Sequence, residues 1–165
     1  MIGFHNYVQG HFKVQRDENE NIKAKTINMI AGGTGIAPML QVARDILKSS
    51  DDQVNEPGIR NIIEFLKTNI NLIFANRTEE DILQKEELEE FAKDERFKVT
   101  YILSRPSESW TGHTGYVNTE LVQSTFPSPS NENIVLLCGP PKMVNEACKP
   151  SLEEAGFDMN RVLTY

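Results

Sequence analysis

The chain has 165 residues, of which 39% are hydrophobic and 25% charged, the composition of a single globular domain. Its net charge of −7 argues against nucleic acid and anionic membrane surfaces as main partners. No apolar run approaches the ~20 residues of a membrane span, and the first residues lack the pattern of a signal peptide. Cys138 and Cys148 are too few for a disulfide framework, so we expect two reduced thiols in an intracellular protein.

The first 25 residues differ from the rest of the chain. Tyr7–Val14 predicts a short strand or half of a hairpin, and the polar stretch Gln15–Lys25 predicts a loop. We therefore expect residues 1–25 to be a linker or hairpin and residues 26–165 to form the main domain.

From Thr26 onward, predicted strands and helices alternate. Short apolar runs predict strands at Thr26–Ala31, Asn71–Asn76, Phe97–Leu103, Ile134–Cys138 and Arg161–Thr164. Helical spacing predicts helices from Pro38 onward and at Ile59–Lys67, Ile82–Lys93, Val117–Ser124 and Lys142–Ala155. Thr78 with Asp81 is typical of a helix cap. Continuous apolar strands separated by helices favour a doubly wound α/β fold around a five-stranded parallel sheet.

In such a sheet the ligand lies beyond the carboxyl ends of the strands. The first strand is followed by Gly32-Gly33-Thr34-Gly35 and then Pro38. Glycines let backbone amides approach a phosphate, and the helix start behind them adds a partial positive charge. The spacing matches neither the G-x-G-x-x-G fingerprint nor a P-loop, so a tight turn and a phosphate-binding loop both remain open.

The other strand ends carry further candidates. Ser104 and Arg105 follow the third strand, where dinucleotide folds carry an acidic residue that binds a ribose hydroxyl. A hydroxyl and a guanidinium tolerate a phosphate there better than a carboxylate does, although an ordinary loop start is the simpler interpretation. Cys138 ends the fourth strand and could touch a planar ligand or act as a small buried hydrophobe. His5, His11 and His113 show no metal-ligand spacing, and we expect Trp110 to anchor the loop Ser104–Gly115 by packing.

Four segments in this order resemble a known family: GGTGIAPM, FANRTEEDIL, a loop with W…GYVN, and CGPPKMV. They are similar to the pyridine-nucleotide domain of NADH–cytochrome b5 reductases and of eukaryotic nitrate reductases, within the ferredoxin–NADP reductase family. The resemblance covers roughly Gly10 to Tyr165 and implies NADH or NADPH as one cofactor and FAD, held mainly by a preceding domain, as the other. It implies hydride transfer from NAD(P)H to FAD, then electron transfer to cytochrome b5 or another heme protein. The isolated domain is then expected to be inactive, and the protein to lie on the cytoplasmic side, either free or attached to a membrane through a segment outside this chain.

The resemblance also implies roles for individual residues. Cys138 would place the nicotinamide ring for hydride transfer, and Thr34 would lie close to the flavin. The pyrophosphate and nicotinamide would lie by Gly32, Gly33, Gly35 and Pro38. The nucleotide groove would be lined by Gly139, Pro140 and Met143, and its adenosine end by Asn76, Ser104, Arg105, Tyr116 and Val117. Tyr165 is either a gate for nicotinamide access or a strand end that packs on the sheet.

Three departures from the family pattern leave a second hypothesis open. No flavin-barrel motif precedes Gly32, so residues 1–25 are expected to be a remnant leading from a flavin domain outside the sequence. Ser104 replaces the acidic residue of NADH-preferring reductases, which favours use of NADPH as well. The segment Ser49–Asn69 is longer than its counterpart and is either a partner contact or a decorated edge. The alternative function is a non-catalytic nucleotide-binding or assembly subunit that has lost its flavin domain, although the intact glycine and CGPP motifs favour the enzyme.

Overall fold

The computed structural model describes residues 24–48 and 68–165. The predicted strand Tyr7–Val14, nearly all of the predicted linker 1–25 and the predicted helix Ile59–Lys67 lie outside these described residues. Within the described residues, no helix is both long and apolar enough to cross a membrane.

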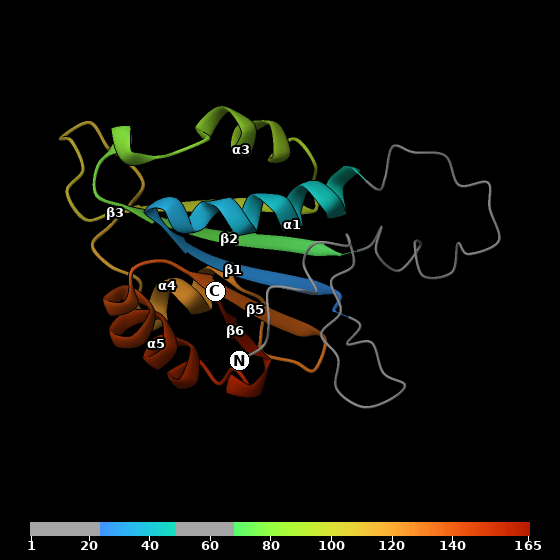
Figure 1. Cartoon of the computed structure of the whole chain (residues 1–165). Coiled ribbons are helices and arrows are strands. Elements are labelled where there is room, and N and C mark those ends of the chain that lie inside the picture. The colour runs from blue at the N-terminus through green and yellow to red at the C-terminus, as the bar shows by residue number, and fades with distance from the viewer. Residues whose placement is uncertain (1–23, 49–67) are drawn as a thin grey trace.

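A parallel sheet of six strands in the order β4-β3-β2-β1-β5-β6 forms the centre of the molecule (Figure 1). The strands are β1 (Thr26–Gly32), β2 (Asn69–Asn76), β3 (Phe97–Leu103), β4 (His113–Thr114), β5 (Asn133–Cys138) and β6 (Val162–Thr164). This confirms the predicted doubly wound α/β fold and corrects the predicted strand count. The extra strand, β4, has 2 residues inside the predicted loop Ser104–Gly115, too short to leave a hydrophobic pattern in the sequence.

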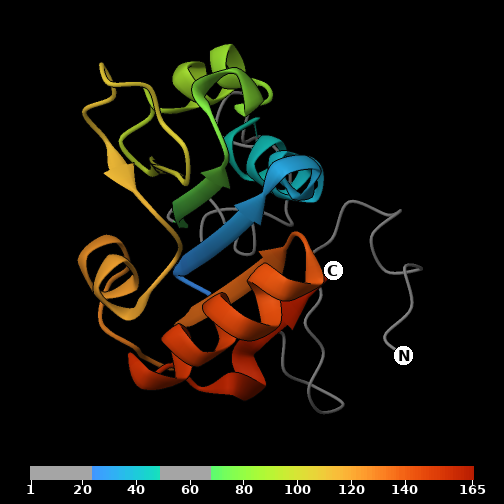
Figure 2. The ribbon, with the colours of Figure 1, turned by 90° about the vertical axis from the view of Figure 1, so that its left-hand side faces the viewer.

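Helices cover both faces of the sheet (Figures 1 and 2). One face carries α1 (Ile36–Lys48) and α3 (Lys85–Phe91), and the opposite face carries α4 (Thr119–Thr125) and α5 (Lys149–Glu154). A π-helical segment, η4 (Met143–Cys148), runs directly into α5, and short 3-10 turns occupy η2 (Gly33–Gly35), η3 (Glu79–Asp81) and η5 (Met159–Arg161). Because each central strand lies between two helical layers, its run of apolar residues is continuous.

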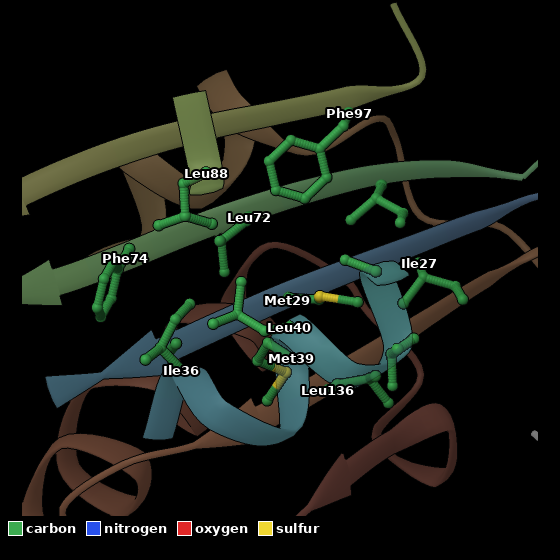
Figure 3. Close-up of a cluster of buried hydrophobic side chains, with 14 of the residues drawn as sticks. Ile27, Met29, Ile36, Met39, Leu40, Leu72, Phe74, Leu88, Phe97 and Leu136 are labelled. Atoms are coloured by element: carbon green, nitrogen blue, oxygen red, sulfur yellow. The ribbon is translucent and has the colours of Figure 1, made fainter. Parts of the chain in front are cut away.

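Two hydrophobic cores follow from this layering. Met29 of β1 and Leu72 of β2 pack under α1 in the first core, which Figure 3 shows together with Met39. The neighbouring positions Ile30 and Ile73 point to the other face and join the second core under α4 and α5. Alternate residues of one strand therefore supply both cores, which leaves the carboxyl ends of the strands as the edge available to a ligand.

Two helix predictions are wrong at their beginnings. The helix predicted over Ile82–Lys93 begins only at Lys85, because the Thr78–Asp81 capping box caps the separate 3-10 turn η3 instead. Ile82 then adopts an extended conformation and Gln84 a left-handed one (φ 54°), which separates that turn from α3. The helix predicted over Val117–Ser124 begins at Thr119, since Asn118 caps it by accepting a 2.8 Å hydrogen bond from Leu121 N.

The last predicted helix, Lys142–Ala155, divides into η4 and α5. Pro150 lies in the first turn of α5 and has no N–H to donate to the carbonyl four residues earlier. A π-helical turn before the proline accommodates that missing bond without breaking the helix. The remaining differences are small: α1 begins at Ile36, so that Pro38 lies within its first turn, and Asn69 is the first residue of β2.

Candidate functional site

An open cleft of about 360 Å³ lies at the carboxyl ends of β1 and β5. Residues from two loops line it: Gly32, Gly33, Thr34, Gly35, Cys138, Gly139 and Pro140. The two motifs are separated by about a hundred residues in the sequence, and the adjacent parallel pairing of β1 with β5 brings them together. Seven predicted site residues thus share one concave surface.

Close backbone approach explains why glycines are needed here. A Cβ atom on Gly35 would lie 2.2 Å from the carbonyl oxygen of Cys138 and 2.9 Å from Gly139 N. A Cβ atom on Gly32 would lie 2.7 Å from the Met143 sulfur, and one on Gly139 would lie 2.5 Å from Met143 Cε. At Gly35 the two loops are therefore packed backbone to backbone, and a side chain there would separate them. At Gly32 and Gly139 a Cβ atom would first meet the flexible end of the Met143 side chain.

Gly33 differs from its neighbours because its surroundings are open. Its φ is +53°, and a Cβ atom built on it would meet no atom of the described residues within 4 Å. Thr34 beside it is exposed, and α1 starts at Ile36 immediately behind this turn. A left-handed glycine with open space in front of a helix start lets a phosphate approach the backbone closely.

Met143 is not among the residues that line the cleft. It is half-buried in the π-helical segment, and its sulfur and methyl group pack against Gly32 and Gly139. It thereby supports the two loops from the side of the second core. Pro38 is half-buried in the first turn of α1 and is not among the residues that line the cleft.

Cys138 is half-buried at the cleft, and burial raises the pKa of its thiol. The group therefore stays protonated at neutral pH, which suits a contact residue and not a nucleophile. Tyr165 lies beside it, since Tyr165 N donates a 2.9 Å hydrogen bond to Leu137 O. Burial and the neighbouring Cys138 raise the pKa of the Tyr165 phenol, although 42% of the residue is exposed. The structure thus places Tyr165 both at the end of β6 and next to the cleft.

A second group of predicted residues meets at the ends of β2 and β3. Ser104 N donates a 3.1 Å hydrogen bond to Asn76 O, so the two strands continue side by side past their last ladder pair. Both polar atoms of the Asn76 side-chain amide are buried, and neither has a hydrogen-bond partner among the residues that the structure describes. A buried unsatisfied amide costs free energy unless a ligand or water satisfies it, so it marks a polar contact point for a ligand.

The last two predicted residues of this group are placed differently from each other. Tyr116 is 77% exposed, directly after Gly115, whose backbone N donates to Leu103 O. Val117 is 4% exposed and packs in the second core, so its side chain is a packing residue. The Tyr116 ring therefore projects freely, while Val117 holds the chain that carries it.

The loop after β3 is fastened by contacts that sequence reasoning missed. The Glu79 carboxylate accepts hydrogen bonds from Ser107 N (3.2 Å) and from the Ser107 hydroxyl, which lowers the pKa of Glu79. Trp110 Nε1 donates to His113 O (3.0 Å), and the ring packs against the first core, as predicted for a loop anchor. Glu79 belongs to the segment FANRTEEDIL, but it is 28 residues from Ser107 and no pattern links the two, so only the fold reveals their contact.

The groups that line this edge of the sheet suit a dinucleotide. Within residues 24–48 and 68–165, no group of three or more His, Cys, Asp or Glu side chains is arranged to hold a metal ion. The glycine-lined cleft, the open left-handed Gly33 and the unsatisfied amide of Asn76 suit the phosphates and hydroxyls of a nucleotide.

Comparison with known proteins agrees with this geometry. The family model described as oxidoreductase NAD-binding domain matches residues 29–149. NADH-cytochrome b5 reductase 1 of Dictyostelium discoideum is 46% identical over 142 residues, which cover 86% of this chain and 44% of that protein. The human protein of the same name is 39% identical over 162 residues, covering 95% of this chain and 48% of that protein.

A solved structure gives the same result. The cytochrome b5 reductase domain of Ulva prolifera nitrate reductase matches with a TM-score of 0.74 and 36% identity, over 86% of this chain and 50% of that one. The chain spans about half the length of the curated relatives it matches. The resemblance stated from the sequence motifs is thereby confirmed. This chain belongs to the family of oxidoreductase NAD-binding domains and is of the type found in NADH–cytochrome b5 reductases.

Proposed function

We propose that this chain is the NAD(P)H-binding half of a flavin-dependent reductase that passes electrons on to a heme protein such as cytochrome b5. One observation carries the proposal: two glycine-containing loops meet backbone to backbone around a cleft that also exposes Cys138. Such a cleft at the carboxyl ends of parallel strands is where α/β sheets bind dinucleotides. The names of the relatives support the choice of acceptor.

NAD(P)H supplies the hydride and FAD accepts it, which leaves the protein with the task of positioning. Gly33 and the start of α1 would hold the diphosphate, since the backbone there is open and left-handed. Cys138 would contact the nicotinamide ring as a neutral thiol, because its raised pKa keeps a charge away from the ring. Thr34, which is exposed at the cleft, and Tyr165, which is partly exposed, would face a flavin domain.

Both NADPH and NADH are proposed as electron donors. The adenosine end would lie over Asn76 and Ser104, with the buried amide of Asn76 free to bond a ribose hydroxyl. Ser104 stands at the end of β3 where dinucleotide folds carry a carboxylate, so that position itself does not repel a phosphate on the ribose. FAD is proposed to be held mainly by a domain outside this sequence.

We also propose that the protein works on the cytoplasmic side, with any membrane attachment made by a segment outside this chain. The two cysteines are both free thiols, which supports a reducing compartment. Fractionation of cells followed by detection of the protein would test this placement, and recovery only from secreted material would contradict it.

The first experiment is to purify the protein from its source and to record its intact mass, its visible spectrum and its response to NADPH and NADH. The proposal expects a polypeptide longer than 165 residues whose flavin absorbance bleaches on addition of reduced nucleotide without oxygen. A chain that binds nucleotide but carries no flavin would instead support the non-catalytic subunit. A chain that binds no nucleotide would exclude both functions.

A further inference from the structure

The thioether of Met143 fills the space behind both glycine-containing loops. A Cβ atom on Gly32 would lie 2.7 Å from the Met143 sulfur and 2.8 Å from its Cε, and one on Gly139 would lie 2.5 Å from the same Cε. The sulfur is therefore in van der Waals contact with the backbone of the first loop, and the methyl group contacts the backbone of both. On this side of the loops, Met143 already occupies the space that one added methyl group would need.

The four methionines within residues 24–48 and 68–165 differ in their access to solvent. Met29 and Met39 are 0% and 1% exposed in the first core, which shields them from an oxidant in solution. Met143 and Met159 are half-buried at the edge of the second core. Met159 belongs to η5, which leads into the amino end of β6, at the end of the parallel sheet opposite the cleft. Met143 therefore combines access for a small oxidant with a contact at the cleft.

Hydrogen peroxide converts such a thioether into a sulfoxide. One peroxide oxygen bonds to the sulfur, the O–O bond breaks and the other oxygen leaves as water, so the sulfur is oxidised by two electrons and the peroxide is reduced. The product is polar and chiral, and methionine sulfoxide reductases return it to the thioether. The added oxygen has no room on the side that faces Gly32, because the sulfur already touches that backbone. An oxidised Met143 must therefore turn out of its place or push the loops away.

We propose that oxidation of Met143 by hydrogen peroxide is a reversible switch that loosens the two loops and weakens binding at the cleft. The backbone favours this coupling, because the π-helical segment begins at Met143 and Val144 N donates a 3.1 Å hydrogen bond to Pro140 O. A displaced side chain at position 143 thus acts on a loop to which its own helix is bonded. The inference goes beyond the proposed function, since it needs the packing of the loops and not the identity of the ligand.

The experiment follows the full chain and three variants, Met143→Leu, Met143→Gln and Met159→Leu, before and after treatment with hydrogen peroxide. Leucine is apolar and of similar volume but cannot be oxidised, whereas glutamine imitates the polar sulfoxide permanently. Met159→Leu removes the other half-buried methionine and is the matched control. Mass spectrometry of peptides measures the oxidation of each methionine, thermal unfolding measures stability, and calorimetry measures the affinity for NAD⁺ and NADP⁺.

Peroxide should oxidise Met143 in the wild type before Met29 and Met39. It should also lower the melting temperature by more than about 3 °C and weaken nucleotide binding by about tenfold. Met159→Leu should respond in the same way, and a methionine sulfoxide reductase should reverse both changes. In Met143→Leu, the melting temperature and the affinity should each be the same before and after peroxide. Met143→Gln should resemble the oxidised wild type without any treatment.

The thiol of Cys138 also lies at the cleft and is present in every variant, so the variants separate its oxidation from that of the methionine. An equal response of Met143→Leu and the wild type would assign the effect to that thiol and overturn the proposal. Failure of peroxide to oxidise Met143, or oxidation without a change in melting temperature and affinity, would overturn it as well. If the untreated wild type binds neither NAD⁺ nor NADP⁺, the proposed function fails, and the melting temperatures still decide whether oxidation loosens the loops.

Discussion

Replacing Gly35 with alanine tests whether the contact between the two loops builds the cleft. The new Cβ atom would lie 2.2 Å from the Cys138 carbonyl oxygen, 2.5 Å from its carbonyl carbon and 2.9 Å from Gly139 N. A methyl carbon does not come closer than about 3 Å to such atoms, so one backbone segment must move by roughly 0.8 Å. Because all three atoms belong to the backbone, no side-chain rotation relieves the overlap.

The expected cost is at the upper end of the range for overpacking, about 3 kcal/mol. For a domain of this size each kcal/mol lowers the melting temperature by about 2–4 °C, so we expect a fall of roughly 6–12 °C. Gly33→Ala is the matched control, since its methyl group meets no atom of the described residues within 4 Å and its φ of +53° is the unfavourable feature. The left-handed conformation costs about 1–2 kcal/mol, part of which the loss of glycine flexibility in the unfolded chain offsets.

Thermal unfolding, followed by circular dichroism at equal protein concentration, measures the stability of both variants. Calorimetry measures the affinity of each variant for NADP⁺. Gly35→Ala should be the less stable of the two and should bind NADP⁺ more weakly than the wild type. A melting temperature within about 2 °C of the wild type, or a larger fall for Gly33→Ala, would refute the argument that the loops pack at van der Waals limits.

Three further outcomes follow from the site. Cys138→Ser in the flavin-containing protein should slow flavin reduction, followed by stopped-flow absorbance, by about tenfold while changing the Kd for nucleotide by less than about twofold. Equal losses in the rate of reduction and in nucleotide affinity would contradict the positioning role. Ser104→Asp should raise the ratio of kcat/KM for NADH to that for NADPH by roughly tenfold, because the carboxylate repels a ribose phosphate. An unchanged ratio would count against placing the adenosine end of the nucleotide at Ser104. Ser107→Ala should lower the melting temperature at pH 7 and by less at a pH well below 4.5. The reason is that the Ser107 bonds lower the pKa of Glu79 below its ordinary 4.5, and the stability they give is lost as the pH falls through that lowered pKa. An equal loss at both pH values would show that the Glu79 charge is not involved.

The strands could be predicted because their signal is local. β3 has the bounds that its apolar run predicted, and β1 and β5 differ from prediction by one residue each. The glycine loop and the CGPP loop were also identified from the sequence, since each carries its own motif. A strand that packs between two helical layers must be apolar along its whole length, so composition alone marks it.

Helix boundaries depended on contacts that the sequence shows less clearly. Asp81 completes a capping box with Thr78, but whether that box starts a long helix or a single turn depends on the conformation of Ile82 and Gln84. Pro150 is visible in the sequence, yet the π-helical turn that accommodates it is one of several solutions to a missing hydrogen bond. Such choices are decided by packing, which overrides local preference.

The sequence by itself determined the α/β fold, the two glycine-containing loops and the family, because each is written in contiguous residues. Only the tertiary structure showed that Gly35 touches the Cys138 carbonyl and that the Asn76 amide is buried with no partner among the described residues. Those facts depend on which strands become neighbours in the sheet. Strand order is set by the burial of both faces of the whole sheet, a property of all its helices together and of no single segment.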